Sequence, residues 1–249
     1  AAAAVNYASA YEWAVFPVHS IRDGACTCSQ PNCGSPGKHP RTARGLNDAT
    51  KDQQVIKGWW QQWPDANIGI RTGQASGIMA VDLDVKDNSN GITNWYDLLD
   101  HHGPASTMTA FTGGGGQHWI YRLPANVEVR NVAGTKLAQG IDVRGDGGYI
   151  VVAPSVHLSG DAYAWEDNAQ AVLAPEWLIT RCATPVVRAA ATIEQPVGGY
   201  EPWVTEALQG VGESYRNHTA SRLVGYFHKQ GVAEDIIQAV LTPFAEACN

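Results

Sequence analysis

The sequence predicts a mixed α/β (α+β) fold in which a main domain with a largely antiparallel sheet precedes a small all-α domain. Three observations predict it. Short β-type segments recur among helical segments through residues 1–182, and the apolar spacing becomes entirely helical over residues 200–249. Residues 183–199 are rich in small residues and Pro and lack periodicity, which is typical of a linker. With 44% hydrophobic residues and nine Trp, the chain can bury a substantial core.

The first predicted elements are a helix, a strand and a second helix. Residues 5–14 have helical apolar spacing, and Ala14–Val18 is a short apolar run typical of a strand. Thr50–Gln53 matches a capping box and predicts the start of a helix that Pro64 ends. The apolar stripe of that helix is Val55, Ile56, Trp59, Trp60 and Trp63. Core packing explains this stripe most simply, and stacking of an exposed Trp on a nucleobase is the alternative.

A strand-rich region follows. Its predicted strands are Asn67–Arg71, Gly77–Asp82, Thr107–Thr112, Gln117–Leu123, Gly140–Arg144 and Gly148–Ala153. Asn90 is placed to cap an intervening helix that ends near Gly103. Three helices are predicted after the linker, at Glu201–Gln209, Ser214–Gln230 and Ala233–Cys248.

The charge distribution limits the kinds of molecule that this protein is expected to bind. A net charge of −7 argues against a uniformly basic nucleic-acid coat but does not exclude a polyanionic substrate. Residues 76–182 carry twelve acidic and six basic side chains, which are either a solvated acidic surface or in part ligands of divalent cations. No apolar run reaches the roughly 18 residues that a membrane helix needs, and the first residues lack the basic region of a signal peptide. We therefore expect a cytoplasmic protein without a membrane partner.

Three of the five cysteines lie within eight residues, in a loop spanning residues 22–44. Cys26, Cys28 and Cys33 are followed six positions later by His39, in a stretch rich in Gly and Pro that can wrap around one ion. Three thiolates and an imidazole are a usual ligand set of a closed, tetrahedral zinc site. The spacing predicts structural Zn²⁺; free thiols in a flexible loop, or one disulfide, are the alternatives.

Two carboxylates end a predicted strand. Asp82 and Asp84 are two positions apart, so strand alternation puts both on one face. Carboxylates this close repel each other unless one is protonated or a cation lies between them, which favours a divalent ion. Capping of a turn is the alternative for Asp residues at a strand end. Asp142 has apolar neighbours on another predicted strand, where an unpaired carboxylate would be costly, so it favours a metal or a cationic partner as well.

A run of four glycines precedes a histidine on the next predicted strand. Glycines 113–116 allow close approach of the backbone to another group, and His118 follows just inside the strand. A histidine on a strand is more often a hydrogen-bonded structural residue than a ligand. Beside a glycine turn, however, it is well placed to donate a hydrogen bond to a phosphate oxygen.

In their order along the chain, these elements resemble a known family. Asp82-x-Asp84, the glycine turn with His118, and the strand-borne Asp142 are similar to the three motifs of the archaeo-eukaryotic primase superfamily, specifically the prim-pol domain of phage and plasmid replication proteins. The resemblance covers about residues 5–180 and includes Gly37–Pro40, Trp59–Gly73 and Gly148–Ser155 with His157. The helical tail resembles the primase C-terminal helical module, through Gly212–Asn217 and Arg222–Tyr226.

The resemblance implies which residues carry the chemistry. Asp82, Asp84 and Asp142 match the positions that bind two Mg²⁺ or Mn²⁺ ions, and two ions about 4 Å apart can clamp the attacking and leaving oxygens of phosphoryl transfer. His118 matches the histidine that contacts the nucleotide phosphates. The resemblance thus implies a catalytic set of four residues.

Three basic residues are further candidates for contacts with phosphate. Lys38 and Arg71 each lie beside glycine in a segment that the resemblance covers, and a solvated surface cation is an equal alternative for either. Arg144 shares a strand face with Asp142, where it could neutralise a carboxylate or reach a phosphate, and it is not included in the predicted set. The zinc loop is expected to be structural or to help hold template.

The resulting hypothesis is a DNA-dependent nucleotidyltransferase with primase and DNA polymerase activity in phage or plasmid replication. Its expected partners are a single-stranded DNA template, a primer and dNTP or NTP, in the cytoplasm of a bacterial host. No Gly-x-x-x-x-Gly-Lys-Ser/Thr occurs, so we expect any helicase activity to lie beyond Asn249 or in another protein. The alternatives are a metal-dependent nuclease and a zinc-bearing single-strand binding module without catalysis.

Overall fold

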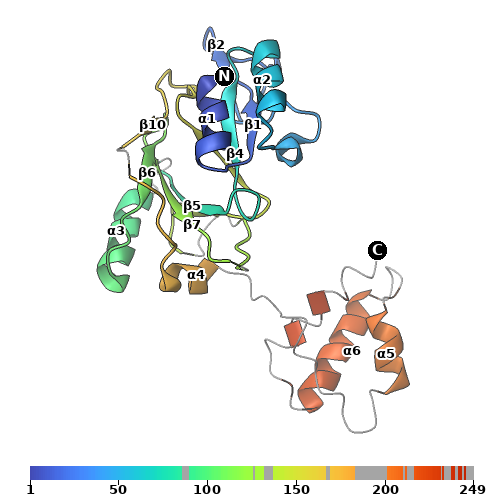
Figure 1. Ribbon diagram of the computed structural model, residues 1–249. Helices are drawn as coiled ribbons and strands as arrows, with labels where there is room; N and C mark the ends of the chain where they lie inside the picture. The colour runs from blue at the N-terminus through green and yellow to red at the C-terminus, as the bar shows by residue number, and fades with distance from the viewer. Residues whose placement is uncertain are drawn as a thin grey trace. The chain divides into compact units, whose positions relative to one another are not determined.

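A computed structural model describes most of the chain and divides it into two units, Ala1–Thr184 and Pro185–Asn249 (Figure 1). The described residues are all except 86–89, 126, 132–136, 167–168, 183–200, 210, 212–215, 231, 233–236, 239–240, 243 and 245–249. The predicted linker, 183–199, and most of the predicted helix Ala233–Cys248 lie outside the described residues. The mixed α+β fold class is confirmed.

Antiparallel pairing builds two main sheets in the first unit. The first has the order β1-β4-β9, and its strands are β1 (Val15–Val18), β4 (Asn67–Arg71) and β9 (Tyr149–Val152). The second has the order β10-β6-β7-β5-β8, and its strands are β5 (Ile78–Leu83), β6 (Met108–Phe111), β7 (Gln117–Arg122), β8 (Ile141–Arg144) and β10 (Ala164–Trp165). A hairpin of β2 (Ile21–Arg22) and β3 (Ala25–Cys26) leads into the cysteine-rich loop.

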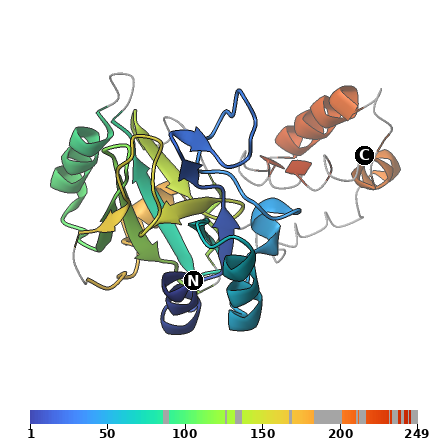
Figure 2. The same ribbon diagram turned by 90° about the horizontal axis from the view of Figure 1, so that it is seen from above.

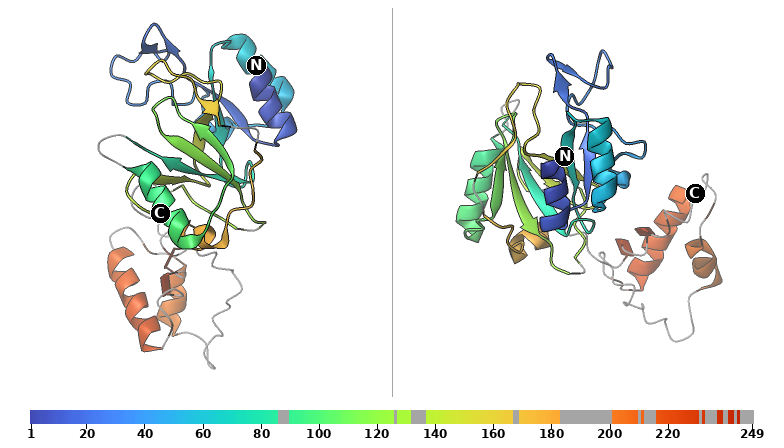
Figure 3. Two further views of the ribbon diagram at one scale, coloured as in Figure 1. Left: turned by 90° about the vertical axis from the view of Figure 1, so that its left-hand side faces the viewer. Right: turned by 45° about the horizontal axis from the view of Figure 1, so that its top comes forward.

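Helices cover both sides of this arrangement. α1 (Ala2–Ala10) and α2 (Gln53–Gln62) pack with β1, whereas α3 (Gly91–His102) lies against β5 and β8 on the other side of the second sheet (Figures 2 and 3). The short helix α4 (Glu176–Cys182) adds Leu178 and Cys182 to the core beside α3. One apolar cluster therefore joins α1 and α2 to both sheets, and a second lies between the second sheet and α3 with α4.

The alternation of side chains along β5 decides on which face of the sheet Asp82 lies. Val81 and Leu83 are fully buried in the cluster beneath α3, while Ala80 packs in the cluster shared with α1 and α2. Because successive side chains of a strand point to opposite faces, Asp82 continues the row of Ala80 rather than that of Val81. Five of the six residues of β5 are buried, and the partly buried one is Asp82.

Several element boundaries differ from the sequence-based expectation. The first helix ends at Ala10 rather than at residue 14, because Glu12 adopts a positive φ of 59° that a right-handed helix cannot contain. The N-cap of α2 is Asp52 rather than Thr50, since the Asp52 carboxylate accepts hydrogen bonds from the N–H groups of Gln54 and Val55. Asn90 occupies the N-cap position of α3 without a side-chain capping bond.

The tryptophan stripe of α2 packs inward, as expected. Trp60 is buried and donates a hydrogen bond from Nε1 to the Ala66 carbonyl at 3.1 Å. Trp59 and Trp63 are partly buried against the same cluster, and the Arg41 guanidinium lies 5.4 Å from the Trp63 ring centroid. Ile56 and the three Trp residues therefore serve the core, whereas Val55 of the predicted stripe is exposed.

The second unit is helical where it is described. α5 (Pro202–Leu208) and α6 (Arg216–Lys229) bury Val204, Leu223 and Phe227 in an apolar cluster of their own. Among the described residues of the whole chain, no helix has both the length and the apolar character needed to cross a bilayer.

A substitution at Gly69 tests the packing of the first sheet. A Cβ on Gly69 would lie 2.5 Å from Cζ of Phe16 and 2.8 Å from Cγ2 of Val18, both fully buried. We expect Gly69→Ala to lower the free energy of unfolding by about 1–3 kcal/mol, because this strand cannot move without disturbing its neighbours. Gly58→Ala is the control: nothing lies within 4 Å of its added Cβ, and in a helix Ala should raise stability by about 0.5–1 kcal/mol. Equal denaturant midpoints for both variants would contradict this account.

Candidate active site

Strand register brings the predicted catalytic residues to one place. In the antiparallel pairing, Asp82 of β5 lies directly opposite His118 of β7 on one side and Asp142 of β8 on the other. Side chains at directly opposed positions of an antiparallel sheet have Cβ atoms about 4.5–5.5 Å apart and share one face. The central strand therefore carries an acid flanked by a histidine and a second acid.

Asp84 completes a group of three carboxylates. Ligand oxygens of Asp82, Asp84 and Asp142 all lie within 4.8 Å of one another. Asp84 follows β5, where its N–H donates to the Gly140 carbonyl at 2.8 Å, and it is the most exposed of the three. Convergent carboxylate oxygens are the donors that Mg²⁺ and Mn²⁺ prefer, so this group fits a hard divalent cation.

Arg144 links two of these carboxylates and was not included in the predicted site. Its Nη2 donates to Asp82 Oδ2 at 3.0 Å and to Asp142 Oδ2 at 2.8 Å, and its Nε donates to Asp82 Oδ2 at 3.2 Å. The sequence signal was the spacing Asp142-x-Arg144, which puts both side chains on one face of β8. The spacing could not show that the guanidinium also reaches across to β5.

Charge around Asp82 keeps it ionised. Burial by itself would raise the pKa of this carboxyl, but the nearby His118 and Arg144 outweigh burial and hold the pKa well below its usual range. His118 Nε2 lies 3.4 Å from Asp82 Oδ1. Among the described residues, the other ring nitrogen of His118, Nδ1, is buried without a hydrogen-bond partner. His118 thus contacts Asp82 through Nε2, while its Nδ1 has no hydrogen-bond partner among the described residues.

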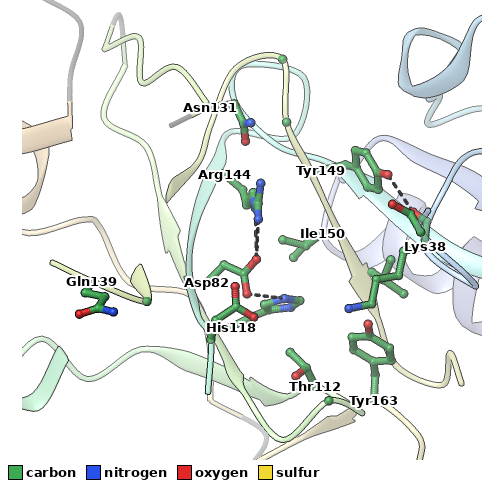
Figure 4. A pocket seen from close by; sticks show the side chains of 17 residues that line it. Lys38, Asp82, Thr112, His118, Asn131, Gln139, Arg144, Tyr149, Ile150 and Tyr163 are labelled. Atoms are coloured by element: carbon green, nitrogen blue, oxygen red, sulfur yellow. Dashed lines mark hydrogen bonds and ion pairs between the residues drawn. The ribbon is translucent and has the colours of Figure 1, made fainter. Parts of the chain in front are cut away.

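Asp82, Asp84, His118 and Arg144 line a cavity of about 670 Å³, whereas Asp142 is not among its lining residues (Figure 4). Pockets of roughly 300–1,000 Å³ accommodate small ligands. Its wall includes residues of both sheets and of connecting loops, namely Ser35, Lys38, Asp82, Asp84, Thr112, Gly114, His118, Asn131, Gln139, Gly140, Arg144, Gly147, Gly148, Tyr149, Ile150, Val151 and Tyr163. Figure 4 shows Lys38 reaching into the cavity from the side opposite Asp82. The cavity therefore has anionic and cationic sides.

The second basic residue predicted to bind nucleotide lies elsewhere. Arg71, the last residue of β4, pairs with Tyr149 in register but is not among the described residues that line the cavity. Two tyrosines of the cavity wall, Tyr149 and Tyr163, were not among the predicted site residues, and burial raises the pKa of each. They come from separate segments, so spacing along the chain carries no signal for them.

The glycine turn packs against the protein as well as bounding the cavity. A Cβ on Gly113 would lie 2.5 Å from the Asp161 carbonyl, and one on Gly116 would collide with the Leu83 carbonyl. Gly115 has a φ of 87°, which favours glycine. The backbone of the glycine turn thus approaches neighbouring chain segments closely, as the glycines predicted. Thr112 and Gly114 line the cavity.

The cysteine-rich loop brings its four predicted ligands together. The donor atoms of Cys26, Cys28, Cys33 and His39 all lie within 4.8 Å of one another. His39 Nε2 is 3.4 Å from the sulfurs of both Cys26 and Cys33. Tetrahedral zinc with Zn–S about 2.3 Å and Zn–N about 2.0 Å implies a sulfur–nitrogen separation of roughly 3.5 Å, so the donor set fits this ion.

Neighbouring groups affect both a thiol and the imidazole of this loop. Burial would raise the pKa of Cys26, but N–H donors, chiefly that of Gly37, lower it to about 6, which favours the thiolate that binds metal. The His19 ring stacks on His39 with centroids 4.4 Å apart. Burial and the adjacent His39 lower the pKa of His19 to about 4, so a neutral ring covers the imidazole ligand.

Comparison with known proteins agrees with this arrangement. No curated protein matches the chain. The family model described as "Bifunctional DNA primase/polymerase, N-terminal" matches residues 4–177, which is more than half of the chain and includes the three carboxylates, His118 and the cysteine-rich loop. The chain therefore belongs to the bifunctional DNA primase/polymerase (Prim-Pol) family.

Proposed function

We propose that this protein is a DNA-dependent nucleotidyltransferase that synthesises primers and extends them on single-stranded DNA. The observation that carries the proposal is the cavity in which Asp82 and Asp84, whose oxygens cluster with those of Asp142, lie beside a histidine and opposite a lysine. Membership in a family of primase-polymerases supports a nucleotidyltransferase. A triphosphate with divalent cations has the charge pattern that such a cavity complements.

Each residue has a proposed part in the reaction. Asp82, Asp84 and Asp142 would hold two divalent ions, which lower the pKa of the primer 3′-hydroxyl and neutralise the phosphates of the incoming nucleotide. Lys38 would bind the triphosphate, and His118 would donate a hydrogen bond to it from a position fixed by Asp82. These two side chains would align the α-phosphate with the 3′-hydroxyl.

Arg144 has a separate proposed part. Its positive charge offsets the negative charges of Asp82 and Asp142 before cations bind. Cations binding to the same oxygens would compete with these hydrogen bonds. The guanidinium would then be available to a phosphate oxygen of the nucleotide, since it already lines the cavity.

The remaining assignments concern the whole chain. We propose that residues 1–182 form the catalytic domain, that 183–199 form a linker, and that the helices of 200–249 help hold the template or initiating nucleotide. The expected setting is phage or plasmid replication in a bacterial cytoplasm, with helicase activity supplied by a separate domain or protein.

Incorporation of labelled nucleotides on unprimed and primed single-stranded DNA, with Mg²⁺ or Mn²⁺, tests the proposal. We expect products whose sequence follows the template. Strand scission without nucleotide addition would instead assign a metal-dependent nuclease. DNA binding without any reaction would assign a zinc-bearing single-strand binding module.

The position of Lys38 predicts its effect on nucleotide affinity. We expect Lys38→Met to raise KM for dNTP by roughly 10–100-fold, because a charge-assisted contact with phosphate is lost. Arg71→Met should change KM by less than about threefold, since Arg71 does not belong to the cavity wall formed by the described residues. Lys57→Met, on the exposed side of α2, is the matched control. Steady-state kinetics at saturating template checks all three, and a larger effect at Arg71 than at Lys38 would contradict the assignment.

A further inference from the structure

The cysteine-rich loop and the catalytic cavity share a segment of chain. Cys33 and His39 are two of the four clustered ligands, and residues 34–38 run between them. Ser35 and Lys38 of this segment line the cavity that contains Asp82. The lysine is therefore directly next to a residue of the Cys3His cluster, while its side chain lines the cavity opposite Asp82 (Figure 4).

Hydrogen bonds hold the segment at its C-terminal end. The Tyr149 hydroxyl donates to the Lys38 carbonyl at 2.8 Å, and Asn67 Nδ2 donates to the Gly37 carbonyl at 2.9 Å. Beyond it, the His19 N–H donates to the His39 carbonyl at 2.9 Å. These bonds tie the backbone of residues 37–39 to β9, to β4 and to the residue after β1.

The thiol cluster contacts the segment at Gly37 and at its two flanking residues, Cys33 and His39. The Gly37 N–H donates to the Cys26 sulfur at 3.4 Å, and His39 Nε2 contacts the sulfurs of Cys26 and Cys33. Gly37 has a φ of 70°, and an added Cβ would lie 3.0 Å from Ile21, so the turn is tightly fitted to the hairpin that carries Cys26. Without an ion, sulfurs and imidazole have no strong attraction that keeps this turn closed.

We propose that zinc in the Cys26, Cys28, Cys33 and His39 site sets the affinity of the catalytic cavity for nucleoside triphosphate by fixing Lys38. This inference rests on the proposed function and gives the loop a role in nucleotide binding, rather than one confined to stability or template. Loss of zinc leaves residues 34–38 tied by the hydrogen bonds from Tyr149 and Asn67 but no longer closed at Cys33 and His39, so the ammonium group is held less firmly opposite the carboxylates. Ordering it again on binding costs conformational entropy, which lowers affinity.

Equilibrium titration of the full chain with dNTP and Ca²⁺ in the absence of DNA measures affinity without turnover. We expect Cys28→Ser to lose zinc, measured by elemental analysis, and to bind dNTP roughly 10–100-fold more weakly, as does Lys38→Met. The variant carrying both substitutions should bind no more weakly than Lys38→Met alone, because zinc acts through that side chain. Gln30→Ala, an exposed loop residue outside the ligand set, should behave as wild type.

Three results would overturn the inference. If Cys28→Ser loses zinc and still binds dNTP normally, zinc does not affect the affinity. If the losses of affinity caused by Cys28→Ser and Lys38→Met multiply in the double variant, zinc acts independently of Lys38. If wild type itself binds no dNTP, the proposed function fails together with this inference. If Cys28→Ser does not fold, removal of zinc from wild type by a chelator, followed by dialysis and zinc addition, gives the same comparison: affinity should fall and then return, and unchanged affinity contradicts the proposal.

Discussion

Asp82→Asn will abolish nucleotide incorporation while leaving the protein folded. Asp82 is the central member of the carboxylate group, opposite both His118 and Asp142 in the sheet. Asn keeps the size of the side chain but removes its charge, so it provides neither an anionic ligand nor a counter-charge for Arg144. We expect incorporation to fall roughly 10³-fold or more, since metal-ion stabilisation of the transition state supplies several kcal/mol.

A surface aspartate provides the control for this experiment. Asp100 is exposed on α3, so Asp100→Asn should retain full activity. Titration with Mn²⁺, followed by electron paramagnetic resonance, should show weaker binding for Asp82→Asn only. If Asp82→Asn keeps more than about a tenth of wild-type activity with unchanged Mn²⁺ affinity, these carboxylates do not form the catalytic metal site.

Arg144→Met will destabilise the metal-free protein and make its stability depend strongly on divalent cations. Arg144 pairs with Asp82 and Asp142 at 3.0 and 2.8 Å in a partly buried setting. Removing one member of such a group leaves neighbouring carboxylates to repel each other, which costs roughly 2–4 kcal/mol at this degree of burial. For a unit of this size, that corresponds to a fall in Tm of about 5–12 °C.

Divalent cations should restore the stability that Arg144→Met loses. Because Mn²⁺ replaces the missing positive charge without having to displace a guanidinium, the rise in Tm on adding Mn²⁺ should be larger for Arg144→Met than for wild type. Arg130→Met is the matched control, as Arg130 forms an exposed ion pair with Glu128 that contributes little. Thermal unfolding with and without Mn²⁺ checks both. Equal Mn²⁺ shifts in wild type and Arg144→Met would show that Arg144 does not compete with cations.

Local patterns in the sequence already indicated the donor groups of both clusters. Two-residue alternation placed Asp82 and Asp84 on one face, and the spacing of Cys26, Cys28 and Cys33 predicted a single wrapped ion. Such inferences need only the geometry of one strand or one short loop. They succeed in naming groups whose donor atoms lie within 4.8 Å of one another in the structure.

The same local patterns were less reliable at element ends. Thr50 looked like the start of a capping box, yet Asp52 is the cap, because both residues offer a side-chain oxygen and only the backbone angles of the flanking turn decide between them. The first helix was extended over Tyr11 and Glu12 because apolar spacing alone does not report a positive φ.

Contacts between distant segments were decided only by the tertiary structure. By itself the sequence determined the mixed α+β class, the two groups of side chains that could hold a metal ion and the resemblance to a primase-polymerase. Register between β5 and β8 then decided that Arg144 bridges Asp82 and Asp142, and docking of the cysteine-rich loop decided that Lys38 rather than Arg71 enters the cavity. The physical reason is that side-chain periodicity is a property of one strand, whereas register and loop docking depend on packing between residues far apart in the chain.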